Sequence, residues 1–113
     1  MDTSVFEQRL REELAALALA GEEGKAERAP VALDQQSTGR LTRMDALQQQ
    51  SMAKATQVRR VARMGALQAA LDRIAAGEFG DCVRCGEEIS EKRLQLDPTI
   101  TTCITCAGAG PAA

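Results

Sequence analysis

The stretch GDCVRCGEEISEKRLQLDPTITTCITC, residues 80–106, contains all four cysteines of the chain. They form two C-x-x-C pairs, Cys82 with Cys85 and Cys103 with Cys106, and seventeen residues separate the pairs. This spacing is typical of structural zinc sites, in which four thiolates satisfy a tetrahedral ion and leave no open position. Gly86 follows the first pair directly and permits the left-handed turn of a zinc knuckle. The stretch therefore predicts one structural Zn²⁺ bound by four cysteines.

Other chemistries of the cysteines fit the chain less well. Iron accepts the same sulfur cage, so the spacing leaves it open. A redox pair is typically a lone C-x-x-C beside a βαβ unit, and the sequence predicts no such unit. The N-terminal sequence MDTSVFEQRLREE lacks the basic and apolar regions of a signal peptide, and no apolar run approaches eighteen residues. We therefore expect a cytoplasmic protein without a membrane span, in which thiols stay reduced and disulfides are disfavoured.

The residues before the cysteines have the periodicity of two long helices. An apolar stripe with steps of four, four and three begins at Phe6 and ends at Leu17, and Thr3 or Ser4 can cap the helix that carries it. Glycines and a proline end this helix between Gly21 and Arg28. A second helix is predicted from about Gly39 to Ala76, where Gly77 supplies a stop.

The second helix carries apolar residues on two nearly opposite sides. One side contains Leu41, Met44, Leu47, Ala55, Val58 and Ala62, and the other contains Met64, Leu67, Leu71 and Ile74. The second set pairs in reverse order with the stripe of the first helix, for example Leu17 with Met64 and Leu10 with Leu71. The two residue numbers of each pair have the same sum, which we call the index sum. A constant sum is what an antiparallel pair produces, and it places the tip of a hairpin at residues 34–43.

These patterns predict a mainly α fold. Residues 1–76 form a long antiparallel helical hairpin, a coiled coil with its tip near 34–43. Residues 77–113 form a small four-cysteine zinc-finger module with a short C-terminal tail or helix. Charge is uneven along the chain, −4 over residues 1–34, +5 over 35–76 and −3 over 77–113. Either the two helices attract each other, or a basic helix face meets an acidic partner.

The combination of a helical hairpin with this finger resembles the DksA/TraR family of bacterial transcription regulators. The matching motifs are G-E-F-G-D-C at residues 77–82, C-x-x-C-G-E-x-I at 82–89, R-L-x-x-x-P at 93–98 and C-I-x-C at 103–106. The resemblance implies that the R-L-x-x-x-P segment forms the return strand of the finger. The resemblance implies a protein that binds RNA polymerase through the secondary channel, with the hairpin tip toward the active site, and that changes the lifetime of promoter complexes. In some members ppGpp strengthens the effect, and the zinc is architectural.

The tip departs from the family pattern. The best-known members carry an acidic D-x-x-D-x-A there, whereas this chain has D-Q-Q-S-T-G at residues 34–39. The first acid, Asp34, is present, but Ser37 replaces the second acid and Gly39 replaces the alanine. Arg40, Arg43 and Asp45 follow directly. These six residues are the candidates for contact with the polymerase near its active site.

The sequence contains no nucleophile–base pair, phosphate-binding loop or carboxylate dyad, so we expect a non-enzymatic protein. We also expect it to act as a monomer. Two other functions are considered. A zinc ribbon that binds DNA is disfavoured, because the finger is acidic and the chain has no Tyr or Trp for stacking on bases. A zinc-stabilised adaptor for another protein remains open.

Overall fold

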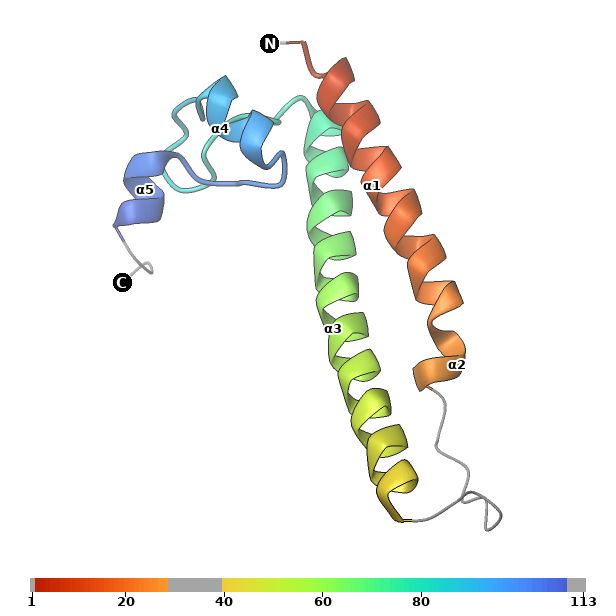
Figure 1. Ribbon diagram of the computed structural model, residues 1–113. Helices are drawn as coiled ribbons and strands as arrows, with labels where there is room; N and C mark the ends of the chain where they lie inside the picture. The colour runs from red at the N-terminus through yellow and green to blue at the C-terminus, as the bar shows by residue number, and fades with distance from the viewer. Residues whose placement is uncertain (1, 29–39, 110–113) are drawn as a thin grey trace. The chain divides into compact units, whose positions relative to one another are not determined.

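A computed structural model describes residues 2–28 and 40–109. Its elements are α1 (Ser4–Glu23), α2 (Lys25–Arg28), α3 (Arg40–Ala76), α4 (Glu91–Leu96) and α5 (Ile104–Gly108) (Figure 1). The described part of the chain contains no β-strand, only an isolated antiparallel bridge between Asp81 and Glu88. The prediction of a mainly α fold is confirmed.

The long helices begin and end close to where the sequence predicted, but the side chain that caps α1 is Asp2 and not Thr3 or Ser4. At the start of α1, the carboxylate of Asp2 accepts hydrogen bonds from the N–H of Ser4 (3.0 Å) and from its hydroxyl (2.8 Å). The helix begins at Ser4 and ends at Glu23, and Gly24 separates it from α2, a short extra helix that the sequence analysis did not predict. α3 ends at Ala76, because Gly77 adopts a φ of 74° that favours glycine.

The described residues up to Leu14 and from Gly65 onward form the first of two compact units. Within it, the beginning of α1 and the end of α3 run antiparallel, side by side (Figure 1). Leu10 of α1 is fully buried, as is Leu67 of α3, and Leu71 is nearly so. The side of α3 that carries Leu67 and Leu71 is therefore the buried one in this unit.

The finger in the same unit has a small apolar core to which α1 contributes. Phe6 is buried together with Cys82, Ile89 and Leu94, and its ring centroid lies 5.4 Å from that of Phe79. Phe6 therefore belongs to the finger core. Helix α1 and the finger are thereby joined by side chains that are more than seventy positions apart in the sequence.

α4 corrects one detail of the family resemblance. Residues 93–98 were expected to form a return strand, but residues up to Leu96 are helical. The helix forms here because Ser90 caps it, its Oγ accepting a hydrogen bond from the N–H of Arg93 at 3.2 Å. Arg9 of α1 donates to the carbonyls of Gln95 (2.5 Å) and Leu96 (3.4 Å) at the other end of α4.

The second compact unit comprises Ala15–Met64, in its described residues. Gly21 of α1 is buried, and a Cβ added there would lie 3.5 Å from Oε1 of Gln57 and 3.6 Å from Cδ of Arg60. At this position the helices approach closely, and the side chains of α3 nearest to Gly21 are polar. The domain division at residue 77 and the individual residue pairings with a constant index sum stay predictions. None of the described helices is long and apolar enough to cross a membrane.

Candidate metal centre

The first C-x-x-C pair lies on a tight turn at the beginning of the finger. The N–H of Cys82 donates to the carbonyl of Glu87 at 2.8 Å, and the N–H of Gly86 donates to the carbonyl of Cys82 at 2.9 Å. Gly86 adopts a φ of 78°, which confirms the left-handed conformation that the sequence predicted after the pair. Cys82 is buried in the finger core, whereas Cys85 is exposed.

The second pair lies at the start of α5. Cys103 occupies the N-cap position, and Cys106 lies within the helix, one turn later. Backbone and side-chain hydrogen bonds attach this pair to the rest of the finger. The N–H of Val83 donates to the carbonyl of Thr101 at 2.9 Å, next to the second pair. The turn of the first pair and the start of α5 are thereby held together.

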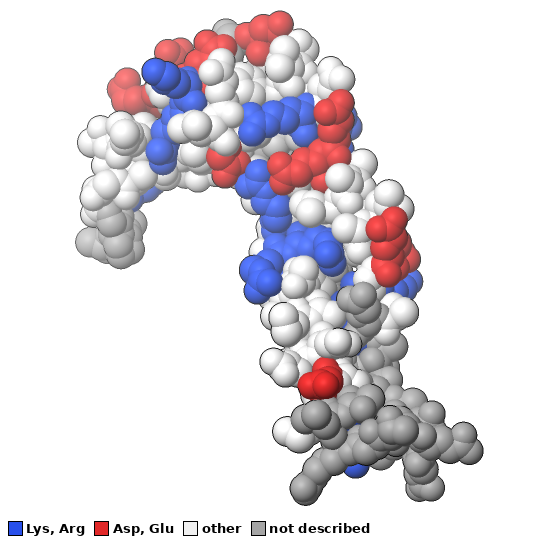
Figure 2. Space-filling model, in the orientation of Figure 1, with Lys and Arg blue, Asp and Glu red and all other residues white. Residues whose placement is uncertain are grey.

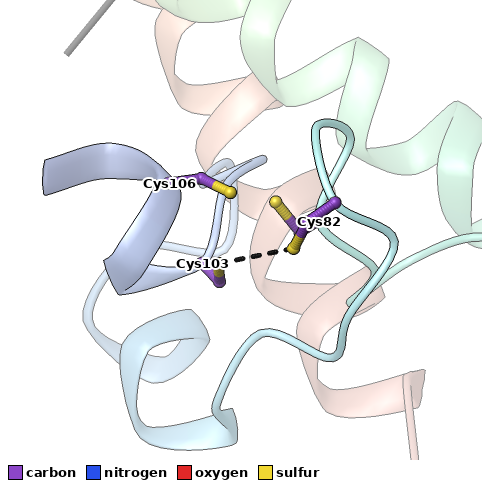
Figure 3. A group of neighbouring side chains, drawn as sticks. Cys82, Cys103 and Cys106 are labelled. Carbon is purple, nitrogen blue, oxygen red and sulfur yellow. Dashed lines mark hydrogen bonds between the residues drawn. The ribbon is translucent and has the colours of Figure 1, made fainter. Parts of the chain in front are cut away.

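The four sulfurs form a compact cluster. All four Sγ atoms lie within 4.8 Å of one another, and those of Cys85 and Cys103 are 3.7 Å apart. The labelled side chains of Cys82, Cys103 and Cys106 point toward one another (Figure 3). Zn–S bonds of 2.3 Å in a tetrahedron place sulfurs about 3.8 Å apart. The donor set and its spacing therefore fit one zinc ion.

Hydrogen bonds and neighbouring thiols move the pKa values of the four cysteines in different directions. The backbone N–H of Cys103 lowers the pKa of Cys82 to about 6, and the N–H of Cys106 lowers the pKa of Cys103. The neighbouring thiols, that of Cys103 foremost, raise the pKa of Cys106 to about 12. Four thiolates this close repel one another, so they need a cation to ionise together. A divalent metal supplies that charge.

Comparison with known proteins gives the same picture. Residues 77–109 match the prokaryotic dksA/traR C4-type zinc finger. A DnaK suppressor protein from Agrobacterium tumefaciens C58, whose structure was solved in solution, is 30% identical, with a TM-score of 0.55 over 96% of this chain and 94% of that one. The chain belongs to the DksA/TraR family.

Two further similarities concern named DksA proteins. The fold is also that of transcription factor DksA2 from Pseudomonas aeruginosa, with a TM-score of 0.78 at 23% identity, over 95% of this chain and 81% of that one. The RNA polymerase-binding transcription factor DksA of Haemophilus influenzae is 42% identical over 43 residues, which are 38% of this chain and 30% of that one. The match spans about a third of the length of the curated relatives.

In this DksA/TraR finger, the metal centre borders a groove of about 610 Å³. Cys85, Cys103 and Cys106 line it, together with exposed apolar side chains such as Leu96 and Ile104. Cys82 lies on the core side and is 3% exposed. A solvent-borne chelator can therefore reach the centre from the groove, but not through the apolar core.

Two arginines that sequence reasoning did not single out hold the second cysteine pair in place. Arg84, which lies between the two cysteines of the first pair, donates from Nη1 to the carbonyl of Cys106 at 2.9 Å. Arg93 of α4 donates from Nε to the carbonyl of Thr102 at 3.0 Å. Each bond joins residues that are nine or more positions apart, and no spacing rule in the sequence indicates them. The finger thus uses two of its three basic residues for internal bonds.

The structure describes only part of the candidate tip. Asp34, Ser37 and Gly39 lie outside the described residues, and Arg40 begins α3. Arg43 and Asp45 are exposed on α3, in the second unit, whereas the cysteines belong to the first. A role for the tip in this DksA/TraR protein stays a prediction.

Proposed function

We propose that this protein is a transcription regulator that binds RNA polymerase through the secondary channel. The helical hairpin enters with its tip toward the active site, and binding changes the lifetime of promoter complexes. The protein acts in the cytoplasm, as a monomer, and is not an enzyme. Membership of the DksA/TraR family carries the proposal, and a relative in Haemophilus influenzae is named an RNA polymerase-binding transcription factor.

The dimensions of α3 suit this function. The helix contains 37 residues, which is about 55 Å at 1.5 Å per residue. The helices of the finger, α4 and α5, have only six and five residues. Paired with α1, it is a stiff element that can deliver a few side chains deep into a narrow opening, whereas a compact domain of the same mass cannot.

We propose that Cys82, Cys85, Cys103 and Cys106 are the zinc ligands and that the metal has a structural role. Four protein ligands leave no coordination position for a substrate or an activated water. The finger core is also small, so metal binding contributes much of its folding free energy, on the order of 10 kcal/mol. Zinc thereby fixes the finger against the end of α3 and presents the helix pair to its partner.

The chemistry at the tip is proposed to differ from that of the best-known members. Asp34 retains the first acid of their motif, while Ser37 and Gly39 replace the second acid and the alanine. Arg40, Arg43 and Asp45 complete the set of proposed contacts. With one carboxylate fewer and two arginines close by, the tip carries a different charge toward the polymerase active site.

Competition for purified RNA polymerase tests the proposal. The zinc-loaded protein is expected to bind the polymerase and to be displaced by a known secondary-channel factor. In transcription from a ribosomal RNA promoter in vitro, wild type is compared with Asp34→Asn, with and without ppGpp. Absence of polymerase binding, or binding that the competitor leaves unchanged, would overturn the proposal.

A DNA-binding zinc ribbon is the second candidate. Residues 77–113 carry a net charge of −3, and two of the three basic residues of the finger donate to its own carbonyls. Few positive charges are therefore available for phosphates. Salt-sensitive binding to bare duplex DNA would support this alternative.

A further inference from the structure

One face of α3 carries apolar side chains that are exposed in the described part of the chain. Met44 is 60% exposed, Leu47 48% and Val58 69%, and Ala55 and Ala62 are exposed as well. With Ser51, these residues follow one another in steps of three and four, so they share one side of the helix. We call this set, Met44, Leu47, Ser51, Ala55, Val58 and Ala62, the outer stripe.

The outer stripe does not belong to the seam with α1. In this unit the residues of α3 that lie nearest to buried Gly21 of α1 are the polar Gln57 and Arg60. At about 100° per residue, the centre of the stripe is about 140° around the helix from that seam. Next to Gly21 the interior seam is therefore lined by polar side chains of α3, whereas the outer stripe is apolar and exposed. Contiguous exposed apolar surface of this kind marks an interaction site.

The charges around the outer stripe indicate what it binds. Arg43 and Lys54 border one edge of the stripe, and Arg59 borders the other. Over residues 43–64 the net charge is +4, and Asp45, the one acid in that range, lies on another side of the helix. Figure 2 shows basic side chains gathered over the middle of α3 beside uncharged surface. An apolar stripe with basic edges is complementary to an apolar ridge with acidic edges.

A second copy of the chain fits this surface poorly. The stripe spans residues 44–62, which is fewer than three heptads, whereas self-supporting coiled coils need three or four. Two copies would also bring together two surfaces with a charge of +4 each. A larger partner that supplies acidic groups avoids both difficulties.

We propose that the outer stripe is the surface on which an acidic, amphipathic helix of the polymerase docks. This inference rests on the proposed function and adds to it which face of α3 makes the contact. Apolar side chains at the centre of the stripe supply most of the affinity, and the arginines and lysine at its edges steer association and make it sensitive to salt.

Two substitutions on α3 test whether the outer stripe is the docking face. Val58 lies on the stripe, whereas Met52, which is 62% exposed, lies about 100° away from its centre. Both side chains are exposed, so Val58→Glu and Met52→Glu are both expected to keep the fold, which circular dichroism checks. We expect Val58→Glu to weaken binding to purified RNA polymerase at least tenfold and Met52→Glu to change it less than twofold. Lys54→Gln should weaken binding several-fold and reduce its salt dependence.

The other outcomes overturn the inference in distinguishable ways. If wild type binds polymerase and both Glu variants bind equally well, or are equally weakened, the stripe is not the docking face, and the proposed function stands. If sedimentation shows a dimer that Val58→Glu dissociates, the occupant is a second copy. If wild type itself does not bind polymerase, the proposed function fails and the inference fails with it.

Discussion

Truncation of Leu94 to alanine is expected to weaken zinc binding although no metal ligand is touched. Leu94 is fully buried in the finger core with Phe6, Cys82 and Ile89. Leu→Ala at such sites costs 2–5 kcal/mol, and we take about 3 kcal/mol because the core is small. Where a finger folds only as it binds zinc, this loss appears in the apparent zinc affinity. At 1.4 kcal/mol per tenfold change, the expected weakening is about 100-fold.

The assay is a competition titration against a fluorescent zinc chelator, with circular dichroism to follow folding. Leu96→Ala is the matched control, because Leu96 lies on the same short helix but is 80% exposed. It should change the affinity by less than about threefold, since surface substitutions stay within roughly 0.5 kcal/mol. Equal affinities for the two variants would refute the coupling between core packing and metal binding.

Three further predictions concern the metal, a helix cap and two glycines. Complete zinc removal by a chelator should unfold the finger while most of the helical circular dichroism survives, and an unchanged NMR spectrum of the finger would contradict a structural metal. Ser90→Ala removes the acceptor for the N–H of Arg93 and should lower the stability of the zinc-loaded protein by about 1 kcal/mol in thermal unfolding; an unchanged melting temperature would exclude this cap as a stabilising contact. Gly86→Ala has open space around it but a φ of 78°, so it should destabilise by about 1–2 kcal/mol. Gly65→Ala, also in open space but inside α3, should stabilise by up to about 1 kcal/mol, and shifts of the same sign at both glycines would contradict the argument.

Features that depend on short sequence separations were predictable. The end of α3 follows from Gly77, and the positive φ of Gly86 follows from its place after a C-x-x-C pair. The start of α1 was also predicted, although Asp2 caps it in place of Thr3 or Ser4. The cysteine cluster was predictable for a similar reason, since the spacing within each pair is a property of one turn. What joins the two pairs was not, because Arg84 and Arg93 donate to carbonyls that no local pattern selects.

Two long helices, a four-cysteine site and their family could be predicted from the sequence, because caps, glycines and ligand spacing act over a few residues. Packing in the folded chain determines which side of α3 is buried and which stays exposed. Both sides have apolar periodicity, and only packing against α1 distinguishes Leu67 and Leu71 from Met44, Leu47 and Val58. It also determines that Phe6, at the start of the chain, completes the finger core beside Phe79. Contacts between residues so far apart depend on how the chain folds, and periodicity along the sequence does not predict them.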